Sequence, residues 1–104
     1  SNDEALIAEI QYKLGLCYME QRLFEQSRSV LLPLCQTATR WAIPALVQIW
    51  LSHLREGNLD LAQESFTQLE TTANWKDIVS AIPLTTREEI ISAYAKDEFG
   101  SLQI

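Results

Sequence analysis

Residues capable of acid–base or nucleophilic chemistry are few in this sequence, and their spacing does not assemble them into a site. The single histidine, His53, has Glu56 and Asp60 nearby, a pattern that could imitate a proton-transfer dyad. Catalysis by such a dyad needs a nucleophile held in a defined turn beside it, and no serine or cysteine takes that position. We therefore expect His53 to be a packed core residue and the protein not to be an enzyme.

Two pairs of adjacent carboxylates, Glu88-Glu89 and Asp97-Glu98, are the other candidates for acid–base work. Neighbouring residues on a helix point in different directions, so neither pair can flank a bond as a catalytic acid and base do. Both pairs are typical of solvated helix faces. The first also places favourable negative charge near the start of a helix.

The two cysteines, Cys17 and Cys35, form no CxxC pair, and with one histidine they cannot make a zinc site. We expect both to be small buried hydrophobes in a reducing compartment, which favours a cytoplasmic location. A disulfide across two facing helices is the less favoured alternative. No metal or cofactor is expected.

Length and charge limit the possible partners. The chain has 104 residues with 47% hydrophobic composition, enough for one domain with its own core. Its formal net charge is −6, and no basic stripe interrupts the acidic sequence. Nucleic acids and anionic membrane surfaces both need such a stripe, so neither is expected as a partner. The longest apolar stretch, residues 41–51, is about half of a bilayer span.

Apolar residues recur at helical spacing along the whole chain, which predicts an all-α protein without strands. Pro33 falls inside the second predicted helix, so we expect a kink or an irregular turn near Val30. Connections of a few residues should make neighbouring helices antiparallel. The predicted helices cover about residues 3–20, 24–38, 42–55, 59–72, 75–82 and 86–98.

Capping residues support the last two of these helices. Asn74 is placed to cap the helix that starts near residue 75. Thr85 or Thr86, followed three residues later by Glu88 or Glu89, predicts a capping box for the final helix.

The strongest pattern is an internal repeat, because the second helix pair follows the first with a shift of 35 residues. Repeats of this size indicate stacked helical hairpins, in which one hairpin cannot bury its apolar face alone. The first block contains Leu14, Gly15, Tyr18, Phe24, Ser27, Leu31 and Leu34, and the second Ile49, Trp50, His53, Leu59, Ala62, Phe66 and Leu69.

These blocks resemble the tetratricopeptide repeat, a helical hairpin of about 34 residues. The likeness covers about residues 8–74 and rests on Leu14-Gly15 with Tyr18, Phe24 with Ser27, and Gly57, Ala62 and Phe66. Trp50 departs from it, because the family has glycine or another small residue there, and residues 75–104 do not repeat the pattern. The resemblance implies one domain, with hairpins at about 3–38 and 42–72 stacked as a right-handed superhelix. Helices at about 75–98 would cap it.

In the family, the first helix of each hairpin lines a concave surface. Carried over to this chain, the resemblance implies an apolar groove lined by Tyr12, Leu16, Met19, Val47, Leu51 and Leu54, with Glu9, Glu20, Gln48 and Arg55 among them. Members that bind the C-terminal carboxylate of heat-shock chaperones have lysine and asparagine where this chain has Tyr12 and Leu16, so that activity is not expected. The alternative to an open groove is that the last helix fills it with Ile90, Ile91, Tyr94 and Phe99.

An apolar groove on a small helical module accepts an amphipathic helix or an extended segment of a protein partner. We therefore expect a non-catalytic scaffold or adaptor. A small chaperone of the type III secretion kind, clamping an export substrate, is the alternative. The sequence leaves open whether residues 1–104 are a whole protein or a domain of a longer one, and it does not give the oligomeric state.

Overall fold

Six α-helices and one 3-10 helix make up the described part of the chain, residues 2–37 and 39–96 of a computed structural model. No strand occurs among those residues, so the predicted all-α class is confirmed. The side chains of residues 2, 75, 91 and 93–96 lie outside the description. The elements are α1 (Asn2–Glu20), α2 (Phe24–Leu31), η1 (Leu32–Gln36), α3 (Ala42–Arg55), α4 (Leu59–Thr72), α5 (Trp75–Ser80) and α6 (Leu84–Lys96).

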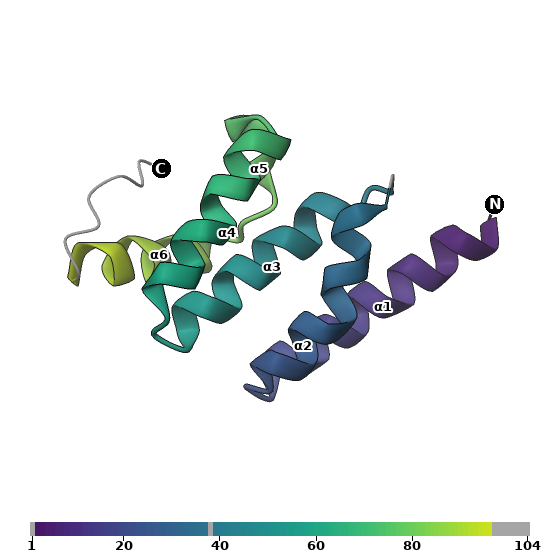
Figure 1. The fold of residues 1–104 in the computed structure, drawn as a ribbon, viewed down its shortest axis with the longest axis horizontal. Coiled ribbons are helices and arrows are strands. Elements are labelled where there is room, and N and C mark those ends of the chain that lie inside the picture. Colours follow the sequence, from purple (N-terminus) through teal and green to yellow (C-terminus); the bar gives the residue numbers. More distant parts are fainter. Residues whose placement is uncertain (1, 38, 97–104) are drawn as a thin grey trace.

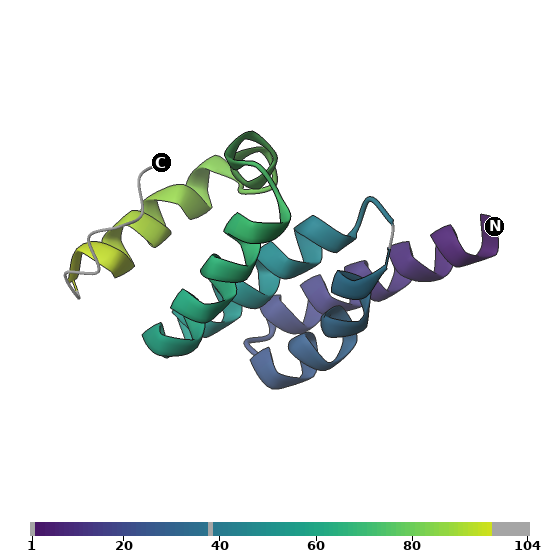
Figure 2. The same cartoon turned by 45° about the horizontal axis from the view of Figure 1, so that its top comes forward.

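The first four α-helices form two antiparallel hairpins, α1–α2 and α3–α4, placed one after the other (Figure 1). The second helix of the first hairpin, with η1, packs against α3 and so joins the two hairpins. Helix α1 lies at one end of this array, and α5 and α6 lie at the other (Figures 1 and 2). In both views the N-terminal half of α1 extends beyond the other helices.

The second predicted helix is interrupted, as its proline indicated. Helix α2 ends at Leu31, and the chain continues as η1 with Pro33 in its first positions. A proline within a helix lacks the backbone N–H that the preceding turn needs, and a tighter 3-10 turn accommodates that loss. The side chain of Thr37 then donates a 2.7 Å hydrogen bond to the carbonyl of Leu34 and closes the element.

Of the two predicted N-terminal caps, the structure confirms that of α5 and contradicts that of α6. The side chain of Asn74 accepts a 2.9 Å hydrogen bond from the backbone of Asp77, so the predicted N-cap of α5 is confirmed. Helix α6 begins at Leu84, which places Thr85 and Thr86 inside its first turn. The predicted capping box is therefore wrong, because the carbonyl of Pro83 starts the helix by accepting from Thr86 and Arg87. Residues 97 and 98 of the predicted last helix lie outside the described residues.

Both hairpin turns close in the same way, 35 residues apart. In each turn one residue has a positive φ, 61° at Arg22 and 78° at Gly57. The structure thus reproduces the sequence repeat in its backbone hydrogen bonds. The matching bonds are Arg22 N to Met19 O and Gly57 N to Leu54 O, both 3.0 Å, and Leu23 N to Tyr18 O and Asn58 N to His53 O, both 2.9 Å.

The positive φ in both turns predicts that removing a glycine from one turn and adding a glycine to the other have opposite effects on stability. A Cβ in the left-handed region costs about 1–2 kcal/mol, so Gly57→Ala should lower the free energy of unfolding by about 1 kcal/mol. Arg22→Gly should raise it by about 0.5 kcal/mol, because relief of that strain exceeds the loss of an exposed cation–π contact with Phe24. Urea unfolding followed by circular dichroism measures both. Equal destabilisation by the two changes would contradict the shared turn geometry.

The two helices of the first hairpin approach each other closely at Gly15. A Cβ built there would lie 2.5 Å from both Cγ and Cδ2 of Leu31, whose side chain is fully buried. The hydroxyl of Ser27 donates a 2.8 Å hydrogen bond to the carbonyl of Gly15 across the same contact. In the second hairpin Ala62, the counterpart of Ser27, is also fully buried. These small residues allow the helix axes to approach closely.

Gly15→Leu should therefore overpack this contact and lower the free energy of unfolding by about 1–3 kcal/mol or more. Adding Leu31→Ala should restore part of the loss, since the two side chains compete for one space. Lys13→Leu is the matched control, because the same side chain there meets solvent at an exposed position of α1. Chemical denaturation of the four proteins gives the coupling. Additive losses in the double variant would argue against this close contact.

Candidate docking surface

The six residues predicted to line an open groove do not form one accessible surface. Tyr12 and Leu16 are half-buried, and the other four are almost fully buried. Desolvation raises the pKa of the Tyr12 phenol, and a hydrogen bond with the Gln48 side chain opposes that shift. The buried four are Met19, Val47, Leu51 and Leu54.

Helices α5 and α6 contribute to the cluster that buries those residues. Ile78, Ile82 and Ile90 belong to the same hydrophobic cluster as Val47 and Leu51. The structure therefore corrects the expectation of an open groove, since the inner face of α3 is already packed. Of the four residues expected to fill the groove, Ile90 does so. Phe99 lies outside the described residues, as do the side chains of Ile91 and Tyr94.

An ion pair fixes α6 to α3 beside this cluster. Arg55 donates from Nε to Glu89 Oε2 at 3.0 Å and from Nη2 to Oε1 at 3.2 Å. The two parallel bonds hold the guanidinium and the carboxylate in one plane. Both side chains are partly exposed, so the ion pair adds little to stability. Its main effect is to orient α6 relative to α3.

The exposed apolar surface lies instead on the outer face of α1. Leu6, Ile7, Ile10 and Leu14 are 54%, 56%, 57% and 41% exposed, and we call these four residues the α1 stripe. Their spacing places them on one side of the helix, and the opposite side contains the buried Ala8, Gly15 and Met19. Single exposed leucines are ordinary, whereas contiguous apolar patches are uncommon on the surfaces of monomeric proteins.

Sequence reasoning missed this surface because periodicity does not reveal which face a helix buries. Ile7, Ile10 and Leu14 recur at the spacing of a core face, yet α1 packs through smaller residues opposite them. A signal was present in the Gly15–Ser27 signature, since that contact fixes which side of α1 meets α2. Once Gly15 faces inward, the three larger residues must face outward.

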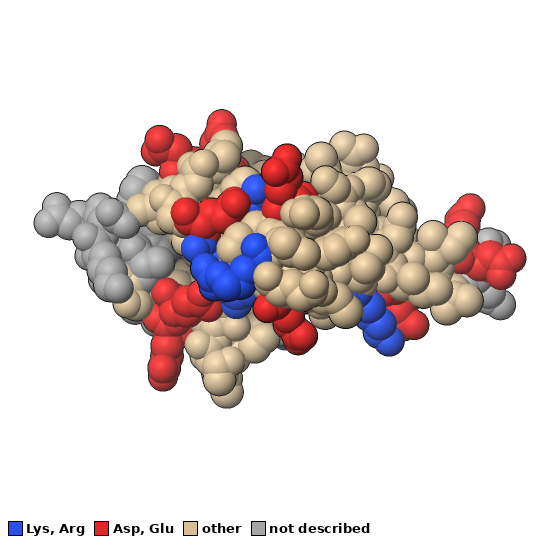
Figure 3. All heavy atoms as spheres, turned by 90° about the horizontal axis from the view of Figure 1, so that it is seen from below, with Lys and Arg blue, Asp and Glu red and all other residues tan. Residues whose placement is uncertain are grey.

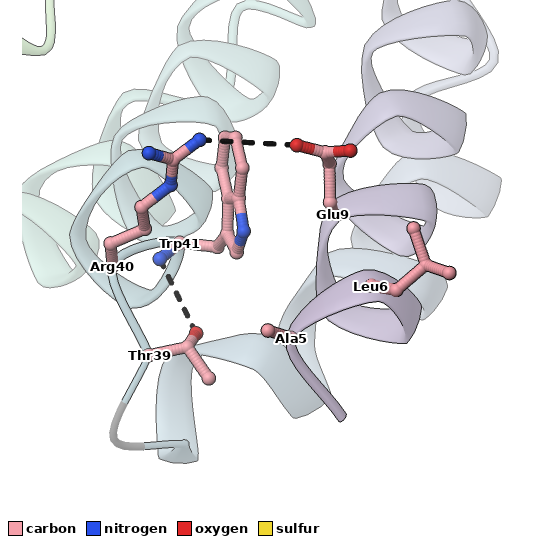
Figure 4. A pocket seen from close by; sticks show the side chains of 6 residues that line it. All are labelled: Ala5, Leu6, Glu9, Thr39, Arg40 and Trp41. Carbon is pink, nitrogen blue, oxygen red and sulfur yellow. Dashed lines mark hydrogen bonds and ion pairs between the residues drawn. The ribbon is translucent and has the colours of Figure 1, made fainter. Parts of the chain in front are cut away.

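A cleft adjoins the inner edge of the α1 stripe at Leu6. Its volume is about 610 Å³, and its walls are the N-terminal part of α1 and residues 39–41. Trp41 forms the back of this Trp41 cleft, stacked against the Tyr12 ring with centroids 5.0 Å apart. Glu9 points across the cleft toward Arg40, whereas Leu6 points outward (Figure 4). Its six lining residues are Ala5, Leu6, Glu9, Thr39, Arg40 and Trp41.

The charges around the cleft form a loose pair. Arg40 Nη2 is 3.9 Å from Glu9 Oε1, and the guanidinium lies 4.4 Å from the centre of the Trp41 ring. The Arg40 side chain is largely exposed, so the ion pair adds little to stability and can be exchanged for a partner's charge. Acidic side chains are spread over the face shown in Figure 3, with basic side chains in small groups beside them.

The polar groups around His53 do not form a catalytic dyad. Desolvation and the nearby Arg28 charge lower the pKa of His53, while Glu56 and Glu64 oppose that shift. Its Nδ1 is buried and has no hydrogen-bond partner among the described residues, so no described carboxylate accepts a proton from that nitrogen. Arg28 instead binds the Ser52 hydroxyl at 2.9 Å and the Glu56 carboxylate at 2.7 Å. This cluster connects α2 to α3.

Comparison with protein-family models, with curated proteins and with solved structures finds no match to this chain. No group of three potential metal ligands occurs among residues 2–37 and 39–96. In that same part of the chain, no helix is both long and apolar enough to cross a bilayer. Inferences about function therefore rest on the surface geometry itself.

The two cysteines differ, which corrects the expectation that both are buried. Cys17 is exposed on α1, one turn beyond Leu14, whereas Cys35 is half-buried in η1. Both are free thiols, so the alternative of a disulfide between them is wrong. Burial raises the pKa of the Cys35 thiol to about 11, because the thiolate loses its hydration there.

Iodoacetamide should therefore alkylate Cys17 at least about ten times faster than Cys35 in the native protein at pH 8. The Cys35 rate should rise about tenfold per pH unit toward pH 11, because the thiolate is the reactive form. Timed quenching and peptide mass spectrometry give the two rates, and denaturation in urea should make them similar. Equal native rates would contradict the placement of the two thiols.

Proposed function

We propose that this chain is a non-catalytic protein-interaction module that docks its partner on the α1 stripe. The observation that supports this function is the alignment of Leu6, Ile7, Ile10 and Leu14, each about half exposed, on the outermost helix. The equivalent face of α3 is covered by α2 and η1, so α1 is where a partner has apolar area to gain.

The size of the stripe limits the kind of contact. Full burial of one leucine or isoleucine contributes about 1.5–3 kcal/mol, so four half-exposed side chains can contribute about 3–6 kcal/mol. Association costs at least about 4 kcal/mol in lost translational and rotational freedom. The stripe alone would thus give a weak complex. A stable partner must also contact the surfaces beside it, and the Trp41 cleft of about 610 Å³ is a hollow that it can reach there.

The partner's chemistry follows from the charges on α1. Asp3, Glu4, Glu9 and Glu20 lie along this helix, in which Lys13 is the one basic residue. Complementary potentials increase association rates and exclude partners of the wrong charge. An amphipathic helix with a leucine-rich face and basic edges fits this surface best.

The secretion-chaperone alternative has less support. Such a chaperone would clamp its substrate in the concave groove, and Val47 and Leu51 in that groove are buried by α5 and α6. Substrate binding there would require both helices to leave, along with the Arg55–Glu89 pair. The outer face of α1 requires no such rearrangement.

Ile10→Glu should leave the melting temperature within about 2 °C of the wild type, because residue 10 is solvent-exposed in the free protein. It should lower partner binding at least tenfold, since a carboxylate buried on docking has no counter-charge. The measurement is capture from an extract of the source cells by immobilised protein, quantified by mass spectrometry. The captured protein is then made recombinantly and titrated.

Leu84→Glu is the matched control, because Leu84 is 74% exposed on α6, far from α1 in the sequence and in the fold. It should bind like the wild type. A partner retained equally by the wild type and both variants would leave the α1 stripe without a role. Loss of binding to both variants would point to a nonspecific effect of the added charge.

A further inference from the structure

The repeat itself identifies what kind of helix the α1 stripe receives. A shift of 35 residues superimposes the outer face of α1 on the corresponding face of α3. On α1 these positions meet solvent, and on α3 they meet the first hairpin. The corresponding pairs are Leu6 and Trp41, Ile7 and Ala42, Ile10 and Ala45, Leu14 and Ile49, and Cys17 and Ser52.

On α3, this face is covered by α2 and η1. Ala45 and Ile49 share a buried cluster with Leu31 and Leu34. At the C-terminal end of the contact, Arg28 donates a 2.9 Å hydrogen bond to Ser52. Arg28 precedes Leu31 and Leu34 in the covering segment, whereas Ser52 follows Ala45 and Ile49 in α3, so the covering segment runs antiparallel to α3.

We propose that the α1 stripe binds a helix of another protein that repeats the α2–η1 face: a basic residue followed, three and six residues later, by two leucines. This inference rests on the proposed function and specifies its partner. In the antiparallel orientation the two leucines cover Ile10 and Leu14, and the base lies beside Cys17. The partner's helix would cover α1 as α2 and η1 cover α3, so the contact would repeat an interface that the molecule already contains.

A second copy of this chain does not supply such a helix from its described residues. The α2–η1 face, with Leu31 and Leu34, is buried against α3. The corresponding face of α4, with Phe66 and Leu69, is buried in the cluster that includes Ile78. Self-association would therefore have to pair one α1 stripe with another, and four half-exposed side chains are far fewer than the roughly 20–30 residues per side of a stable complex.

Charge distinguishes the partner's helix from α2–η1. The N-terminal turn of α1 contains Asp3 and Glu4. An antiparallel helix would place its C-terminus, the negative end of its dipole, beside those two carboxylates. A lysine or arginine in the last turn of the partner's helix removes this repulsion. The end of η1 is Gln36, so the partner should bind better than an exact copy of α2–η1.

A synthetic peptide tests the inference directly. It has the sequence of residues 23–37 with Cys35→Ser and Gln36→Lys, so that it keeps Pro33 and the alignment of Leu34 with Leu31 and has a basic last turn. Its binding to the 104-residue protein is measured by fluorescence anisotropy. We expect saturable binding that weakens at least tenfold with Ile10→Glu in the protein, or with Leu31→Glu in the peptide, and less than twofold with Leu84→Glu in the protein.

Cys17 provides a second measurement that locates the peptide. Its counterpart Ser52 is fully buried beneath Arg28, so a bound peptide should cover Cys17 in the same way. Saturating peptide should slow alkylation of Cys17 at least tenfold and leave the Cys35 rate unchanged. Leu14→Lys is the second protein variant, for use if Ile10→Glu does not fold, and it should weaken binding to a similar extent.

Several results would overturn the inference. Peptide binding that persists in Ile10→Glu and leaves Cys17 reactive would place the peptide elsewhere, for example on α3 in place of the chain's own α2. Concentration-dependent dimerisation abolished by Ile10→Glu would make a second copy the occupant. Absence of peptide binding, while a captured partner still depends on Ile10, would refute this helix type and leave the proposed function standing. Loss of both would refute both.

Discussion

The structure depends on one constraint: a helical hairpin cannot bury all of its apolar surface by itself. It needs contact with a neighbouring element to do so. The first helix of a hairpin has apolar residues on several sides, and its own partner helix covers only one of them. For α3 a second side is covered by Leu31 and Leu34 of the preceding hairpin, and the inner side by Ile78, Ile82 and Ile90. Hairpin stability is therefore shared between neighbours, and an end of the array either has a cap or remains apolar.

The two ends of this array have met that constraint differently. At the C-terminal end, α5 and α6 cover the core and Arg55 holds Glu89 in place. At the N-terminal end, Leu6, Ile7, Ile10 and Leu14 face solvent. Among the described residues, the outer face of α3 is therefore covered and that of α1 is not. The packing of α5 and α6 also explains why Val47 and Leu51, expected in an accessible groove, are buried.

Local sequence signals predicted the fold well, and they predicted the candidate site poorly. Helix bounds, the interruption at Pro33 and the Asn74 cap depend on residues within a turn of one another, which periodicity and capping rules describe. Exposure of Ile10 depends on which other helices pack against α1, and the apolar periodicity of a single helix does not show that. Burial of Val47 and Leu51 likewise depended on α6, whose weak pattern did not show where it would pack. Only the 35-residue equivalence between α1 and α3 carries the missing information, because it compares the same face with and without a neighbour.

Pro33 has a geometric consequence for how the hairpins join. In an α-helix, residues three apart differ by about 60° around the axis, whereas in a 3-10 helix they are aligned. The change of helix type after Leu31 therefore turns Leu34 toward the same line as Leu31, and both are fully buried between the hairpins. Leu32 lies about a third of a turn from Leu31 in either helix type and is 55% exposed. The proline thus keeps Leu31 and Leu34 on one side of the segment that joins the two hairpins.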